Sequence, residues 1–148
     1  MDSGGLMPDG EMREILVHGG PDEAFDRAVV FARRMAESFG ARLHVLYTVG
    51  EPLSAGWTAE VSAVRLPEVH DAMATEAQER LASLIPLEDQ ERLGVEFVLR
   101  TGPAAEELVR YTTEEKVDLA IVQLRSDDDT GAAHALLEHG RCAVLVLR

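Results

Sequence analysis

The sequence predicts an α/β fold built on a doubly wound, five-stranded parallel sheet with helices on both faces. Short apolar runs of strand length alternate along the chain with segments whose apolar residues recur at helical spacing. The strand-like runs are apolar almost throughout, as is typical of parallel strands that are covered on both faces. Right-handed crossovers between such strands place the connecting helices on the two sides of the sheet.

The composition indicates one globular domain and argues against two classes of partner. The chain has 148 residues, of which 46% are hydrophobic and 28% are charged, enough for a single core. A net charge of -13 repels nucleic acids and anionic membranes. The single cysteine, Cys142, lies in an apolar run and is expected to be a small core residue. Because the chain lacks a signal-peptide pattern and an apolar run of bilayer length, the expected location is the cytoplasm.

The predicted domain begins with a strand and a helix. Residues 1–11 are rich in glycine and acidic residues and are expected to form a disordered leader before a single domain at 12–148. The first strand is predicted at residues 14–18, and a helix capped by Asp22 is expected to run to Phe39. Gly40 is the expected residue just past the helix end. The apolar stripe of this helix comprises Phe25, Ala28, Val29, Ala32, Met35, Ala36 and Phe39.

The middle of the chain is predicted to hold a buried strand, a long loop and a second helix. Residues 42–49 leave little room for a solvent-facing side, so both faces of this strand are expected to be buried. Residues 50–67 contain Trp57 and are interpreted as a surface loop rather than a lid over the strand ends. The second helix is predicted at 68–84, followed by a short acidic connector at 87–92.

The last part of the chain is predicted to contain three strands and two helices. A strand at 95–100 precedes a helix that opens with Pro103 at its first position and ends near Lys116. Residues 117–124 and 142–148 form the two remaining strands. The connection between them combines an acidic turn with a short helix, and in a parallel sheet such a turn faces the ligand-binding edge.

Three segments, residues 15–49, residues 94–122 and the closing CAVLVLR, together resemble the universal stress protein family. The opening G-P-A-x-E-x-L of the third helix, at residues 102–108, is the most specific of the shared patterns. The resemblance implies a Rossmann-like sheet in the order 3-2-1-4-5, similar to that of the adenine nucleotide alpha hydrolases. It also implies a cytosolic homodimer.

The nucleotide-binding motif of that family is altered in this chain. Nucleotide-binding members carry G-x-x-G, nine further residues and G-[S/T] after the fourth strand, where the glycines bring backbone N–H groups close to the phosphates. Here Gln123 and Ser126 stand in place of the first two glycines, and Thr130 and Gly131 replace the final pair in a shorter loop. Gly20 occupies the place of the aspartate that contacts adenine in those members.

The charge of the same loop also argues against tight ATP binding. Asp127, Asp128 and Asp129 precede a helix N-terminus, where they are favourable and where a phosphate would otherwise bind. A triphosphate would meet like charge there, at a cost on the order of 1 kcal/mol per pair. A solvated capping turn is favoured over a divalent-cation site, because the spacing is not that of a calcium loop. Should a ligand site survive, the residues expected to form it are His18, Gly19, Gly20, Val49, Gln123, Arg125, Ser126, Thr130 and Gly131.

No catalytic set and no metal-ligand set stands out in the sequence. Residues 18–22 resemble the S-G-G-x-D-S loop of adenylating pyrophosphatases, but His18 and Glu23 replace its two serines. A turn followed by a helix cap explains this segment fully, so the turn is favoured over an enzyme loop. His134 and His139 are five residues apart and do not share a helix face.

The last strand is the strongest functional candidate, because in the order 3-2-1-4-5 it is an edge of the sheet. Its residues 142–147 are uncharged and include no proline, and the strand lies at the end of the sequence, so we expect nothing to cover it. The sequence therefore predicts a homodimer through Cys142, Ala143, Val144, Leu145, Val146 and Leu147.

Three functions follow from these observations. The first is a dimeric stress-response or regulatory protein that does not bind ATP. The second is a protein that still binds an adenine nucleotide or another small ligand in the altered cleft, and the third is an adenylating-type enzyme.

Overall fold

The computed structural model of the chain describes residues 11–20, 23–49, 59–123 and 131–148, and for residues 59–67 it describes the backbone alone. The predicted disordered leader therefore lies, apart from Glu11, outside the described residues. The same holds for Asp22, the expected helix cap, and for Trp57 in the predicted loop.

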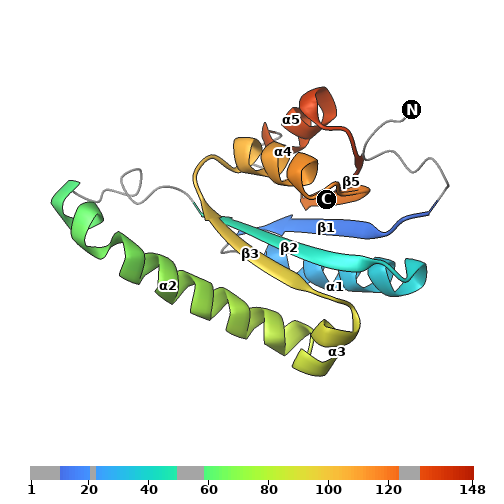
Figure 1. The fold of residues 1–148 in the computed structure, drawn as a ribbon, viewed down its shortest axis with the longest axis horizontal. Coiled ribbons are helices and arrows are strands. Elements are labelled where there is room, and N and C mark those ends of the chain that lie inside the picture. Colours follow the sequence, from blue (N-terminus) through green and yellow to red (C-terminus); the bar gives the residue numbers. More distant parts are fainter. Residues whose placement is uncertain (1–10, 21–22, 50–58, 124–130) are drawn as a thin grey trace.

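The structure confirms the predicted fold class. The five strands pair in parallel in the order β3-β2-β1-β4-β5, and Figure 1 shows helices above and below the sheet. The elements are β1 Glu14–Gly19, α1 Ala24–Phe39, β2 Arg42–Val49, α2 Ala59–Leu84, α3 Leu87–Arg92, β3 Glu96–Thr101, α4 Ala104–Glu114, β4 Leu119–Gln123, α5 Gly131–His139 and β5 Ala143–Leu147.

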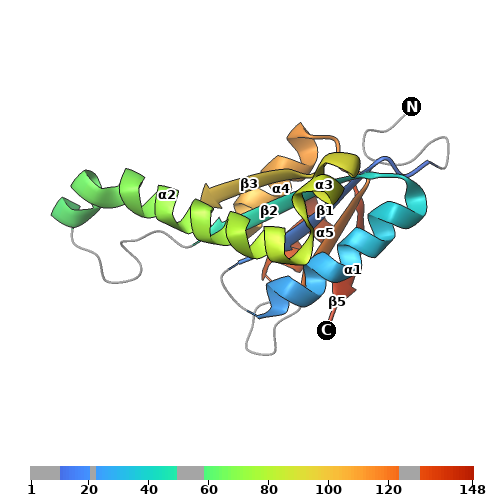
Figure 2. The same ribbon diagram turned by 90° about the horizontal axis from the view of Figure 1, so that it is seen from below.

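Two apolar cores fill the space between the sheet and its helices. Figure 2 shows α1 and α2 on one side of the sheet, whereas α4 and α5 lie on the other. Alternate residues of β1 serve the two cores, with Ile15 and Val17 on the α1 side and Leu16 on the α4 side. β2 is buried on both faces from Leu43 to Val49, as predicted.

Two helical assignments differ from the prediction. Residues 59–67 were expected to belong to a loop, but they form the first turns of α2, which continues through Pro67. Proline is a helix breaker only by local preference, and the residues before it are mostly good helix formers. The predicted connector at 87–92 is the helix α3, whose first turn carries Glu88 and Asp89 where carboxylates favour a helix N-terminus.

The C-terminal end of α1 is fixed by the glycine that follows it. Gly40 adopts a left-handed conformation with φ 65°, and its backbone N–H donates to the carbonyl oxygens of Ala36 and Glu37, as expected for a helix end. Phe39 was predicted to belong to the apolar stripe of this helix, but it is the last residue of α1 and is exposed.

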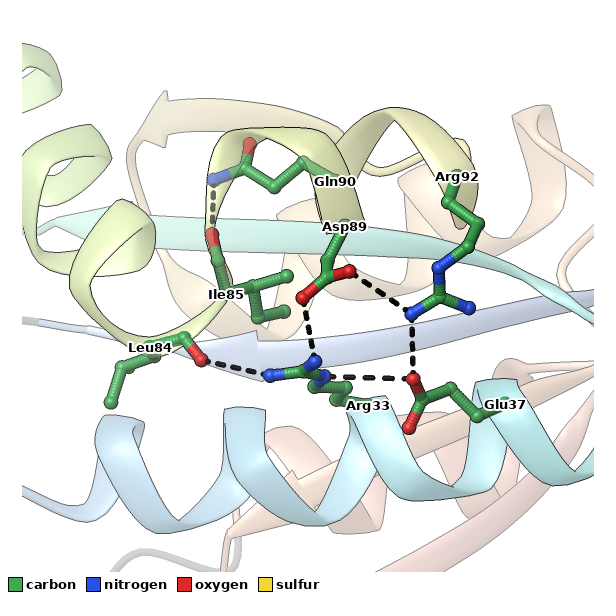
Figure 3. Close-up of polar contacts among 7 residues, drawn as sticks. All are labelled: Arg33, Glu37, Leu84, Ile85, Asp89, Gln90 and Arg92. Carbon is green, nitrogen blue, oxygen red and sulfur yellow. Dashed lines mark hydrogen bonds and ion pairs between the residues drawn. The ribbon is translucent and has the colours of Figure 1, made fainter.

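A cluster of ion pairs joins α1 to the junction between α2 and α3 (Figure 3). Arg33 Nη2 donates to Asp89 Oδ2 at 2.8 Å, and Arg33 Nη1 donates to the carbonyl oxygen of Leu84 at 3.3 Å. Arg92 Nη2 donates to Glu37 Oε2 at 2.8 Å and to Asp89 Oδ1 at 3.3 Å. The cluster fixes the position of α1 relative to the chain segment that leads into β3.

A second polar network is buried near the amino ends of β1 and β2. His44 Nε2 donates to the carboxylate Oε1 of Glu14 at 2.6 Å, and the hydroxyl of Tyr111 lies 2.8 Å from His44 Nδ1. Burial raises the pKa of the Tyr111 phenol, and the nearby carboxylate of Glu96 raises it further. The network joins α4 to the sheet, and both ring nitrogens of the buried His44 have a hydrogen-bond partner.

Candidate functional site

The sheet opens between β1 and β4 at the carboxyl ends of these strands. Pairing between β1 and β4 stops at Val17 and Ile121, whereas pairing of β1 with β2 continues to Gly19 and Tyr47. Strand β4 itself continues to Gln123. The two strands therefore separate at the point where the strand order reverses, which is the place where open α/β sheets bind ligands. The candidates His18, Gly19, Val49 and Gln123 all lie at this edge.

His18 is held at the end of β1 by a contact with the neighbouring strand. Its ring nitrogen Nε2 lies 2.8 Å from Thr48 Oγ1, a hydrogen-bond distance. Thr48 is buried in β2, so this contact joins the ends of β1 and β2. The imidazole is thus engaged in holding the strand ends.

Close packing surrounds the two glycines that follow His18, and it excludes a side chain most clearly at Gly19. A Cβ atom on Gly19 would lie 2.4 Å from Cδ1 of Phe25, whose ring packs edge-to-face on Tyr47 with centroids 5.3 Å apart. A Cβ atom on Gly20 would lie 3.2 Å from the carbonyl oxygen of Thr48. Packing against Phe25 accounts for Gly19 without a bound phosphate, and Gly20 lies close to the backbone of β2.

Val49 ends β2 and is tied to the turn before α4. Its carbonyl oxygen accepts a hydrogen bond from the backbone N–H of Gly102 at 3.0 Å, and its side chain is buried. Gly102 has φ 141°, a conformation that glycine adopts readily and other residues do not. Helix α4 begins at Ala104, with Pro103 as its N-cap residue rather than its first helical residue.

Gln123 brings a polar side chain to the end of β4. Its side-chain oxygen Oε1 is buried and has no hydrogen-bond partner among the residues that the structure describes. Of the other predicted loop residues, Arg125, Ser126 and Thr130 lie outside the described residues, as do Asp127, Asp128 and Asp129. Gly131 is the exposed first residue of α5.

Strand β5 is an edge of the sheet, as expected. The backbone N–H of Ala143 donates to the carbonyl oxygen of Asp118 at 3.0 Å, toward β4. Because N–H groups alternate in direction along a strand, those of Val144 and Val146 point away from β4. The Val146 side chain is 38% exposed, and within the described chain no strand pairs with the outer side of β5.

Cys142 lies half-buried just before β5 and packs against the core on the α4 side. Burial raises the pKa of its thiol, which keeps the sulfur protonated near neutral pH. Across the described residues, no three His, Cys, Asp or Glu side chains come together as metal ligands would. No helix in the described part of the chain has both the length and the apolar character needed to cross a bilayer.

Sequence reasoning missed a hollow of about 510 Å³ beside α1, which is lined in part by Val30, Phe31, Gln123 and Leu147. The helix stripe that contributes to it was visible in the sequence, because Arg27, Val30, Phe31 and Arg34 recur at helical spacing. This second stripe lies next to the buried one, and only the position of β5 makes it part of a hollow.

Comparison with known proteins connects the fold to one family. The profile of the Universal stress protein family matches residues 12–148. Universal stress protein UspA from Lactobacillus plantarum is 22% identical, with a TM-score of 0.74 over 94% of this chain and 99% of that chain. A universal stress protein family structure from Burkholderia pseudomallei is 24% identical, with a TM-score of 0.60 over 95% and 98% of the two chains.

A further structure with the same fold contains a nucleotide. The universal stress protein from Archaeoglobus fulgidus in complex with dAMP is 14% identical, with a TM-score of 0.57 over 93% of this chain and 98% of that chain. No curated protein sequence matches this chain.

Proposed function

The chain belongs to the universal stress protein family, and from this premise we propose that it acts as a homodimer joined through β5 and does not hold ATP tightly. In this proposal the dimer is a regulatory protein of the stress response rather than an enzyme. The observation that carries the proposal is the outer edge of β5, with which no strand of the described residues pairs, and the crevice at the strand ends supports its second half.

The edge strand supports assembly through its backbone and its side chains. The outward N–H groups of Val144 and Val146 can pair with a second copy of β5 without disturbing the hydrogen bonds to β4. All residues of β5 are apolar, so a paired edge would also bury the exposed part of Val146. With a two-fold axis at this edge, each copy would contribute the same surface, its strand β5, to the interface.

The crevice between β1 and β4 supports the absence of tight triphosphate binding. Gln123 brings a side chain to the position where a glycine would let the backbone approach a phosphate. Gly19 is explained by the packing of Phe25, and Gly20 lies close to the backbone of β2. The sequence then places Asp127 and its two acidic neighbours next along the chain, where they would repel a polyphosphate.

The assembly is tested by removing one outward N–H group from β5. Val146→Pro deletes the donor that faces away from β4, whereas the matched control Val146→Thr keeps the donor and a β-branched side chain. We expect the parent and Val146→Thr to sediment as dimers at tens of micromolar, and Val146→Pro to sediment as a monomer. A parent chain that is monomeric, or a Val146→Pro variant that is as dimeric as the parent, would contradict the proposal.

The nucleotide half of the proposal is tested by thermal unfolding with magnesium and ATP. A ligand at about 100 times its Kd stabilises a protein by roughly 2.7 kcal/mol, equivalent to several degrees in a domain of this size. We expect no rise with 1 mM ATP. A rise of several degrees would show that the crevice retains a triphosphate site, and a rise with AMP alone would favour a nucleotide monophosphate as ligand.

A further inference from the structure

A hollow on the α1 side of β4 and β5 carries an inference that does not rest on the proposed assembly, although Leu147 belongs to both surfaces. We define the arginine hollow by its apolar lining and its cationic rim, which comprise Arg27, Val30, Phe31, Arg34, Leu147 and Arg148. The α1 members occupy positions i, i+3, i+4 and i+7 of the helix and so lie along one stripe. Its volume of about 510 Å³ is within the range of small-molecule sites.

The charge of the hollow is opposite to that of the chain. Although the chain carries a net charge of -13, the basic residues of the hollow outnumber its one acidic residue, Asp26. The carboxylate of Asp26 is already engaged, because Arg80 Nε donates to its Oδ1 at 2.7 Å. Among the side chains that line the hollow, the three arginines therefore outnumber the one carboxylate, which Arg80 already pairs.

The arginines elsewhere in the described chain are almost all paired. Those with an acidic partner are Arg13, Arg33, Arg42, Arg80, Arg92, Arg100 and Arg110. Arg27, Arg34, Arg141 and Arg148 have no such partner among the described residues, and all of them except Arg141 line the hollow. In a protein this acidic, unpaired arginines gathered at one hollow favour an external anion as the partner.

The apolar residues that line the hollow indicate that its ligand also has an apolar part. Val30 is 39% exposed and Phe31 38% exposed, and both lie on the same stripe of α1 as Arg27 and Arg34, while Leu147 adds an apolar side chain from β5. A ligand that covers these side chains would remove apolar surface from water. The negative field of the whole chain opposes a dianionic phosphate more strongly than a single carboxylate.

We propose that the arginine hollow binds a small amphipathic carboxylate of the medium-chain acyl type. The acyl chain lies against Val30, Phe31 and Leu147, and the carboxylate accepts hydrogen bonds from guanidinium groups of the rim. Planar guanidinium groups bind carboxylates with two parallel hydrogen bonds, which gives the head group a defined position. The site is separate from the crevice between β1 and β4, with which it shares Gln123 alone.

Calorimetric titration with decanoate, below its micelle concentration, tests the cationic rim. The double variant Arg27→Gln, Arg34→Gln removes two rim charges, and the matched control Arg141→Gln removes an unpaired arginine that lies outside the hollow. We expect the double variant to weaken binding by about tenfold or more, and the control to bind as the parent does. Equal binding by the double variant, or an equal loss in Arg141→Gln, would overturn the proposal.

A chain-length series tests the apolar floor. Decanoate is expected to bind more tightly than octanoate, and octanoate more tightly than hexanoate, by roughly two- to fourfold per methylene group. In parallel, the amide resonances of Val30, Phe31 and Leu147 should shift on titration. Affinities that do not depend on chain length would contradict the assignment. It would also be contradicted if the monomeric Val146→Pro variant bound decanoate and the dimeric parent did not, because the hollow of the parent would then be occupied by the second copy.

Discussion

Asp89 is predicted to be the residue through which the junction of α2 and α3 holds α1 in place. Its carboxylate accepts hydrogen bonds from Arg33 and Arg92, and the side chains of Arg33 and Asp89 are only 27% and 25% exposed (Figure 3). Asp89→Ala removes both interactions and leaves the guanidinium group of Arg33 with the carbonyl oxygen of Leu84 and a distant contact to Glu37.

The expected loss of stability in Asp89→Ala depends on how exposed Arg33 and Arg92 are, because solvent weakens an ion pair. The pair of Arg33 with Asp89 is partly shielded from water and should contribute about 1–2 kcal/mol after solvent screening. Arg92 is more than half exposed, so its contact with Asp89 should add only a few tenths of a kcal/mol. The expected loss in the free energy of unfolding is about 1–2 kcal/mol, equivalent to a fall in Tm of about 3–8 °C.

Urea unfolding followed by circular dichroism measures this loss, with Glu91→Ala as the control. Glu91 belongs to the same helix, is exposed and has no side-chain partner among the described residues, so its removal should change stability by less than about 0.5 kcal/mol. In 1 M NaCl the effect of Asp89→Ala should shrink without vanishing, because its main pair is partly buried. The reasoning is refuted if Asp89→Ala is as stable as Glu91→Ala, or if salt abolishes the whole difference.

Two further predictions concern buried groups. Gly19→Ala would place a Cβ atom 2.4 Å from the ring of Phe25, so we expect a loss of about 1–3 kcal/mol in urea unfolding; unchanged stability would argue that Gly19 is kept for a ligand instead. Burial raises the pKa of Tyr111 above its ordinary value of 10.0, so above pH 10 the native state retains a proton that the unfolded state releases. Stability should therefore fall as pH rises above 10, and less steeply in Tyr111→Phe; equal slopes for parent and variant would count against a buried neutral phenol.

The strands and most helices could be predicted because their signals are local. The apolar run at 42–49 and the stripe from Phe25 to Ala36 depend on the spacing of neighbouring residues, which the sequence displays directly. The resemblance, rather than periodicity, supplied the strand order, which the structure confirms. The start of α2 was misplaced because Pro67 carries a strong local preference that the surrounding helix overrides.

By itself, the sequence determined the class of fold and the apolar last strand. Only the tertiary structure decided that Phe25 packs on Gly19, that Arg33 pairs with Asp89 and that a stripe of α1 meets the end of β5. The reason is that periodicity is a property of consecutive residues, whereas a contact or a hollow depends on where distant segments come together.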